Sequence, residues 1–156
     1  ADVPRIKSSL QEKTPEQIGG IRRWDGSTPL HMVSSQLPNP PDTQQIQESI
    51  KILLQAGIAP DAIDQFGQTS LHYATRTGNQ IAAQCLLDAG ANPNARETKH
   101  GSTPLHYAAT LGNLELIEII VHAGGMQDTV RNDGKSPAQL LAQYHPHKST
   151  KRIPAH

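Results

Sequence analysis

The sequence predicts an all-α repeat solenoid, in which short helix-turn-helix-hairpin units stack side by side and line a concave groove. Two observations predict it: a hexad that occurs four times, and a largely apolar run ending in glycine that follows three of the hexads. The composition agrees, since only 3% of the residues are aromatic while Ala, Leu and Ile recur in short helical groups. Such side chains suit thin helices that pack closely in a stack.

Each hexad predicts the start of a helix. The copies are Gly-Ser-Thr-Pro-Leu-His at 26–31 and again at 101–106, Gly-Gln-Thr-Ser-Leu-His at 67–72 and Gly-Lys-Ser-Pro-Ala-Gln at 134–139. Their glycines are 41, 34 and 33 residues apart. Glycine permits a positive φ in the turn, Thr or Ser can cap the helix that follows, and Pro suits the first helical position.

The apolar runs predict where a second helix of each unit ends. They lie at 50–57, 83–90 and 117–124, and the last residue of each is glycine. A glycine there can take the left-handed conformation that closes a helix. Because the two short helices of one unit bury little by themselves, about three or more units must stack to form a stable core.

With these two signatures in fixed phase, the chain resembles the ankyrin-repeat family. The family's unit of about 33 residues carries a Thr-Pro-Leu-His turn, two antiparallel helices and a Gly-Ala exit into a hairpin. The resemblance covers roughly residues 24–144. It implies repeats at about 24–63, 64–97 and 98–130, a C-terminal half-repeat at 131–144, an N-terminal extension with a capping turn at 1–23, and a flexible tail at 145–156.

The first unit departs from the family pattern. It carries about eight residues beyond the usual period, with three prolines among residues 34–43. We expect a longer loop between its two helices, with Asp42 or Thr43 as the N-cap of the second helix. Loops of this kind often carry function, but a tolerated insertion is at least as good an explanation.

Charge and composition exclude several classes of function. Lys plus Arg and Asp plus Glu both number 14, so no net basic charge points to nucleic acid. No apolar run approaches the roughly 18 to 20 residues of a membrane span. Cys85 is the only cysteine, which excludes an intramolecular disulfide and favours a reducing compartment such as the cytoplasm. A secretory signal pattern is absent, but the chain begins at Ala1, so a removed leader or a trimmed chain stays open.

The residues offer no catalytic, metal or cofactor site. His31, His72 and His106 share one hexad position, so stacking would hold them roughly 10 Å apart, whereas zinc ligands lie about 2 Å from the ion. In the ankyrin pattern this histidine is structural and hydrogen-bonds around its turn. Cys85 lies in an apolar run typical of a packed thiol, and the sequence has neither a phosphate-binding glycine loop nor a nucleophile elbow. We therefore expect neither an enzyme nor a cofactor.

The resemblance implies a surface that binds another protein. Ankyrin partners usually contact the hairpin tips and the first-helix face that lines the groove. Carried over by register, the tip candidates are Trp24, Asp25, Gln65, Phe66, Lys99, His100, Asn132 and Asp133, and the first-helix candidates are Met32, Tyr73, Arg76, Tyr107 and Leu111. The set includes the only Trp, the only Phe and two of the three Tyr, and aromatic residues and Arg are enriched at binding hot spots.

Packing is the alternative role for the aromatic candidates. Trp24 would pack under the N-terminal cap, and for Trp24 and Phe66 binding and packing are evenly matched. For Tyr73 and Tyr107 we expect a mixed role, with the ring edge buried and the hydroxyl facing the groove.

The functional prediction is a protein-protein interaction module, a scaffold or adaptor that is a monomer in isolation. One alternative is a regulatory or targeting region of a larger protein, such as a host-directed bacterial effector or an enzyme's substrate adaptor. Another is a metal or small-ligand role of the tail, where His145 and His147 flank a proline.

Overall fold

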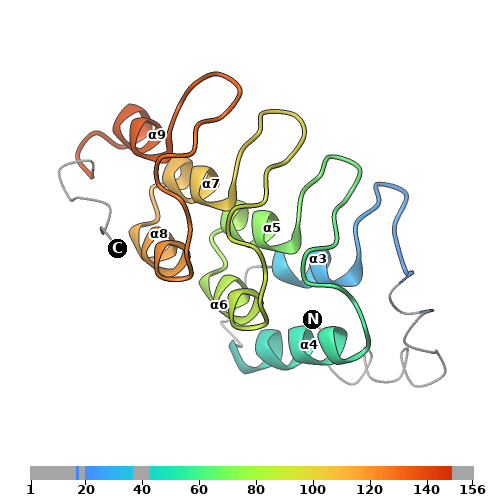
Figure 1. The fold of residues 1–156 in the computed structure, drawn as a ribbon. Helices are drawn as coiled ribbons and strands as arrows, with labels where there is room; N and C mark the ends of the chain where they lie inside the picture. The colour runs from blue at the N-terminus through green and yellow to red at the C-terminus, as the bar shows by residue number, and fades with distance from the viewer. Residues whose placement is uncertain (1–16, 18–19, 37–42, 149–156) are drawn as a thin grey trace.

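The computed structural model describes residues 17, 20–36 and 43–148, which form two rows of helices with hairpins projecting to one side (Figure 1). The inner row contains α3 (Pro29–Ser34), α5 (Ser70–Thr77), α7 (Pro104–Leu111) and α9 (Pro137–Tyr144), and the outer row contains α4 (Thr43–Gln55), α6 (Gln80–Asp88) and α8 (Leu114–His122). Successive helices pack together within each row. The described residues include no strand, and the predicted all-α repeat solenoid is confirmed.

Every inner helix begins directly after the Thr or Ser of a hexad. The extended residues Thr28 and Thr69 accept hydrogen bonds from the backbone N–H groups of His31 and His72, as expected for helix caps. Proline occupies the first helical position of α3, α7 and α9, whereas α5 has Ser70 there. The hexad therefore acts as a helix start in all four units.

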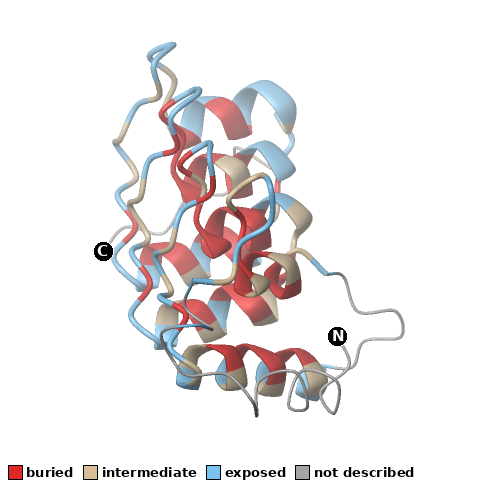
Figure 2. Cartoon of the chain, turned by 90° about the vertical axis from the view of Figure 1, so that its right-hand side faces the viewer, coloured by how far each residue is buried: buried red, intermediate tan, exposed pale blue. Residues whose placement is uncertain are grey.

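The core lies between the two rows of helices. Leu30, Leu71 and Leu105, which share one hexad position, are fully buried, as are Ala74 and Ala108. These small and aliphatic side chains let neighbouring units approach closely, which explains why the fold needs few aromatic residues. Figure 2 shows the buried residues gathered where the helices face one another, with exposed residues on the hairpins and outer surface.

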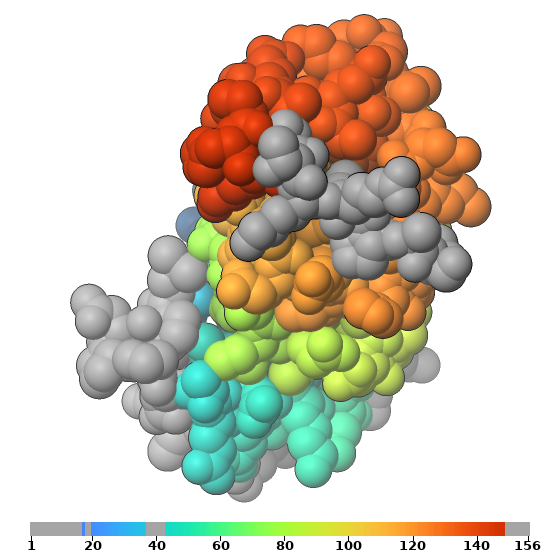
Figure 3. Space-filling model, turned by 90° about the vertical axis from the view of Figure 1, so that its left-hand side faces the viewer, coloured from blue at the N-terminus to red at the C-terminus, as the bar shows by residue number. Residues whose placement is uncertain are grey.

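Backbone hydrogen bonds join each hairpin to the next one. The carbonyl oxygen of the residue before a hexad glycine accepts a bond from the following hairpin: Asp25 from Gln65, Phe66 from Thr98 and His100 from Asn132, each at 2.9 Å. The tips therefore form one continuous row. In the view of Figure 3 the units lie in chain order, from α4 at one end to α9 and the last hairpin at the other.

The insertion in the first unit lies between α3 and α4. Thr43 was one candidate for the N-cap of α4. It is instead the first residue of that helix. Asp42, the other candidate, falls outside the described residues, as do 37–41 and most of the expected capping turn before Trp24. The repeat boundaries stay predictions.

The last described residues, 145–148, contact the end of α7. The Nε2 atom of His145 donates a hydrogen bond to the carbonyl oxygen of Thr110, 2.8 Å away, and the Nζ atom of Lys148 donates to that of Gly112 at 2.8 Å. A side chain on Gly112 would collide with the His145 ring, so glycine makes this close approach possible. Residues 145–148 are therefore held against the end of α7.

Candidate protein-interaction surface

The first two hairpin tips carry the chain's only Trp and only Phe. The side chain of Trp24 is 85% exposed and that of Phe66 is 48% exposed. Large apolar side chains at the surface contribute little to a core, and neighbouring ones commonly mark a binding surface. Neither side chain is therefore packed in the buried core.

The other tip candidates are polar. Gln65, Lys99, His100 and Asn132 are exposed. Gln65, His100 and Asn132 take part in the backbone bonds between hairpins, and the Lys99 N–H donates to Glu97 of its own turn. The side chains therefore project from an ordered row. A partner would meet these side chains without first having to order the loops that carry them.

Asp25 and Asp133 help to hold their own turns. The Asp25 carboxylate accepts hydrogen bonds from the Ser27 hydroxyl at 2.6 Å and backbone N–H at 2.9 Å, and both lower the pKa of Asp25. Asp133 forms an ion pair with Arg131 and accepts the Lys135 N–H, and these contacts lower its pKa in the same way. Both carboxylates are thus already engaged within their hairpins.

Two further carboxylates hold the middle hairpins, and sequence analysis missed them. Asp64, 5% exposed, accepts the N–H groups of Phe66 and Gln68 at 2.8 and 2.9 Å.

Glu97, 2% exposed, likewise accepts three N–H groups, those of Lys99, His100 and Ser102, at 2.6 to 3.0 Å. Burial by itself would raise the pKa of Glu97, but these backbone donors hold it below its usual value. The signal in the sequence was an acidic residue three or four positions before a hexad glycine.

The hexad histidines lie behind the tips and are structural, as the ankyrin pattern implies. In the first unit, Nδ1 of His31 accepts the Thr28 N–H at 3.0 Å, and Nε2 donates to the Gln68 carbonyl oxygen of the next unit at 2.8 Å. His72 and His106 repeat both contacts. Burial lowers the pKa of all three rings, to about 4 for His106, so they are neutral at pH 7.

Tyr73 is more deeply buried than its expected mixed role requires. Its ring is 9% exposed and packs edge-on against His31, with ring centres 4.9 Å apart. Its hydroxyl donates a hydrogen bond to Asp64 at 2.7 Å instead of facing the groove. This contact is a correction to the prediction, and it makes Tyr73 a packing residue.

Tyr107 has the same position one unit later but a different environment. Its ring is half-buried and packs edge-on against His72, with ring centres 5.7 Å apart. Its hydroxyl makes no hydrogen bond to the described residues, and burial raises its pKa. The Tyr107 hydroxyl can therefore still donate a hydrogen bond, whereas the Tyr73 hydroxyl already donates to Asp64.

The remaining groove candidates flank these rings. The Arg76 guanidinium lies 4.8 Å from the centre of the Tyr73 ring and donates to the Gln68 side chain at 3.0 Å. Leu111 is 43% exposed, and Met32 is half-buried, with its sulfur 3.3 Å from an Arg23 nitrogen. The inner helices thus carry an exposed cation, a half-buried phenol and partly exposed apolar side chains.

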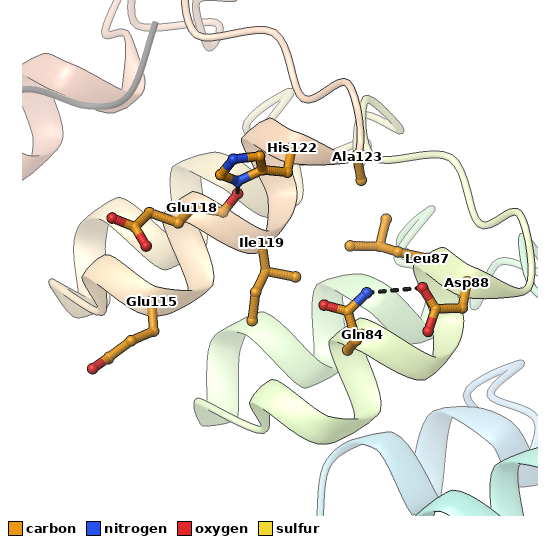
Figure 4. Close-up of a pocket in the computed structure, with 8 residues that line it drawn as sticks. All are labelled: Gln84, Leu87, Asp88, Glu115, Glu118, Ile119, His122 and Ala123. Carbon is orange, nitrogen blue, oxygen red and sulfur yellow. Dashed lines mark hydrogen bonds between the residues drawn. The ribbon is translucent and has the colours of Figure 1, made fainter. Parts of the chain in front are cut away.

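An acidic groove lies on the outer helices, between α6 and α8 (Figure 4). Its lining residues are Gln84, Leu87, Asp88, Glu115, Glu118, Ile119, His122 and Ala123. Gln84 donates to Asp88 at 2.8 Å, and His122 donates from Nδ1 to the carbonyl oxygen of Glu118 on its own helix at 2.8 Å. Sequence analysis did not single out this groove.

The comparison with protein families decides the family. The model described as ankyrin repeats in three copies matches residues 7–97 and 42–133. This chain belongs to the ankyrin-repeat family. Ankyrin repeats mediate protein-protein interaction, and an ankyrin domain is a non-catalytic interaction module.

Two curated proteins share the ankyrin region. Glycerophosphocholine phosphodiesterase gde1 of Schizosaccharomyces pombe is 35% identical over 85 residues, which cover 54% of this chain and 8% of that protein. E3 ubiquitin-protein ligase KEG of Arabidopsis thaliana is 33% identical over 142 residues, which cover 90% of this chain and 9% of the ligase. The ankyrin chain therefore spans less than a tenth of the length of either relative.

The described residues also bear on metal sites, membrane spans and thiol chemistry. Within residues 17, 20–36 and 43–148, no three His, Cys, Asp or Glu side chains gather as a metal site would require. The helices described there are all too short or too polar to cross a membrane. Cys85 on α6 is half-buried, and burial and nearby Asp88 raise the pKa of its thiol, which disfavours the reactive thiolate.

Proposed function

We propose that this chain recognises a partner protein through its hairpin tips and the groove along its inner helices. The observation that carries the proposal is the exposure of Trp24 and Phe66 on neighbouring tips. Tryptophan is among the residue types most enriched at binding hot spots, and neither side chain contributes to the buried core. Selection for binding accounts for such residues better than selection for stability does.

The construction of the tips supports the same role. Carboxylates fix the turns from within, and backbone hydrogen bonds join the turns to one another. A surface ordered in advance loses less conformational entropy when it binds, so more of the contact energy appears as affinity. The exposed side chains are therefore displayed on a rigid support.

The relatives favour a role within a larger assembly. A phosphodiesterase and a ubiquitin-protein ligase both contain a matching ankyrin region that is a small part of their length. We propose that this module acts as a scaffold or adaptor and is a monomer in isolation. A regulatory or targeting region of a larger protein, such as an enzyme's substrate adaptor or a host-directed bacterial effector, is the alternative. Finding a catalytic domain in the same full-length chain would favour that alternative.

Affinity capture from lysate tests the surface directly. We would compare the unaltered chain with the double variant Trp24→Ala/Phe66→Ala and with a control, Lys51→Ala/Glu118→Ala, on the outer helices. Each variant is first checked for unchanged helical circular dichroism. We expect the control to retain the same proteins as the unaltered chain and the tip variant to lose them. Loss in the outer-face control with retention in the tip variant would contradict the proposal.

A further inference from the structure

We propose that the concave face selects an acidic, extended peptide of its partner, whose carboxylates meet Arg76, Arg96 and the hydroxyl of Tyr107. This inference rests on the proposed function, because it specifies what that same surface binds. The net charge of the chain is zero, but its charges are unevenly distributed between the two rows of helices.

The two rows of helices differ in the sign of their charge. The outer helices α4, α6 and α8 carry the acidic residues Glu48, Asp88, Glu115 and Glu118, with Lys51 as the one Lys or Arg on them. The inner helices α3, α5, α7 and α9 carry Arg76 and no acidic residue. The groove side of the helical stack is therefore the more positive side.

The hairpins carry both cations and carboxylates, and most of the carboxylates are engaged in hydrogen bonds. Asp25, Asp64, Glu97 and Asp133 accept backbone N–H groups of their own turns, and Asp61 accepts that of Asn92 in the next hairpin. The cationic side chains of Arg23, Arg96 and Lys99 are exposed. A ligand approaching the tips thus meets exposed cations and carboxylates that are already engaged, while the exposed Asp128 adds an acidic side chain in the loop after α8.

The comparison of Tyr73 with Tyr107 shows where a ligand carboxylate fits. In the second unit the Tyr73 hydroxyl donates to the Asp64 carboxylate at 2.7 Å. The corresponding carboxylate of the third unit, on Glu97, already accepts hydrogen bonds from three backbone N–H groups. The Tyr107 hydroxyl is left without a protein partner among the described residues, and its oxygen is not one of the buried unpartnered atoms, so a ligand can reach it. A carboxylate from a bound peptide would complete the same pair.

Charges of both signs act on this open position. Burial and the Glu97 carboxylate raise the pKa of the Tyr107 hydroxyl, whereas the charges of Arg76 and Arg131 lower it. Arg131 is already paired with Asp133, whereas Arg76 donates to an amide oxygen and is exposed. Arg96 is exposed and directly precedes Glu97 in the same hairpin. A guanidinium beside a phenol donor is well suited to a carboxylate, since charge-assisted hydrogen bonds are the stronger ones.

Apolar contacts would accompany the charged ones. Leu111 follows Tyr107 by one turn of α7, and its side chain is 43% exposed. The side chains of Trp24 and Phe66 are exposed on the hairpin tips. Acidic residues alternating with apolar ones would therefore match the face better than a purely acidic segment.

Three synthetic peptides of equal length and identical apolar residues test the proposal, one with Asp and Glu, one with Asn and Gln, and one with Lys. Trp24 is the only tryptophan, so its fluorescence reports binding at the tips, and calorimetry gives the affinity. We expect the acidic peptide to bind at least about tenfold more tightly than the amide peptide. We also expect its affinity to fall as salt rises from about 50 mM to about 500 mM.

Single variants then locate the contact. Arg76→Gln and Tyr107→Phe should each weaken binding of the acidic peptide several-fold with unchanged circular dichroism, whereas Lys51→Gln on the outer helices should not. Equal affinity for the acidic and amide peptides, or no effect of Tyr107→Phe, would overturn the inference. The proposed function would still stand in that case if Phe66→Ala abolished binding of both peptides, and it would fail if both bound Phe66→Ala unchanged.

Discussion

The Nε2 atom of His72 donates a hydrogen bond to the carbonyl oxygen of Ser102, 3.0 Å away in the next unit, while Nδ1 accepts the N–H of Thr69 at 3.1 Å. One ring thus closes its own turn and attaches the following unit. An imidazolium has a proton on both nitrogens and could not accept at Nδ1. The stack therefore depends on neutral histidine at three equivalent positions.

We expect stability to fall as the pH is lowered from 7 to 5. Because burial holds the folded pKa of these histidines below about 6.5, the unfolded chain binds more protons in this range and acid favours unfolding. The carboxylates Asp25, Glu97 and Asp133 have lowered pKa values, so their contribution is lost only at lower pH. Urea midpoints at pH 7, 6 and 5 measure the effect. A constant or rising midpoint would contradict it, and His106→Gln should reduce the dependence.

Replacing Ser70 with Pro should stabilise the domain. Ser70 is the first residue of α5, where α3, α7 and α9 have proline, and its buried hydroxyl has no hydrogen-bond partner within the described part of the chain. Proline would restrict the unfolded chain and remove the unsatisfied group, a gain of about 1 kcal/mol or roughly 3 to 5 °C in melting temperature.

The matched change in the third unit is Pro104→Ser. It should lower the melting temperature by a similar amount, since it reverses the same substitution at the start of α7. Calorimetric scans of both variants measure the pair. A lower melting temperature for Ser70→Pro would show that the first turn of α5 differs from the other three.

Removing the hydroxyl of Tyr73 should destabilise the fold, whereas the same change at Tyr107 should not. Tyr73 donates to a buried carboxylate of Asp64 and Tyr107 makes no such bond, so Tyr73→Phe should cost about 1 to 2 kcal/mol. Chemical denaturation of Tyr73→Phe and Tyr107→Phe gives the two free energies of unfolding. Equal values would mean that the Tyr73–Asp64 bond adds no stability.

Much of the fold could be predicted because its signals are local. The capping residue, the proline and the structural histidine all lie within one hexad, so a repeated hexad predicts a repeated helix start. The contacts of Asp64 and Glu97 were missed because the hairpins differ in length, and counting back from the glycine does not align the two acids. The position of His145 against Thr110 joins residues 35 apart and depends on how α7 and α9 pack.

The binding surface could be predicted only in part. The register of the repeats placed Trp24 and Phe66 on the hairpin tips, but it could not show whether their side chains are exposed or packed. It also treated Tyr73 and Tyr107 as equivalent, although only the Tyr73 hydroxyl donates a hydrogen bond to a carboxylate of its own unit. Such differences between repeats arise from hairpin geometry, which the helical signatures do not contain.

Photo-crosslinking tests the central claim, that a partner protein binds at the tips, most directly. A benzoylphenylalanine placed at Phe66 on a tip is compared in lysate with one placed at Ile119 in the groove between α6 and α8. We predict a discrete crosslinked product from position 66 and none from position 119. A product from position 119 alone would place the partner on the outer helices and contradict the account.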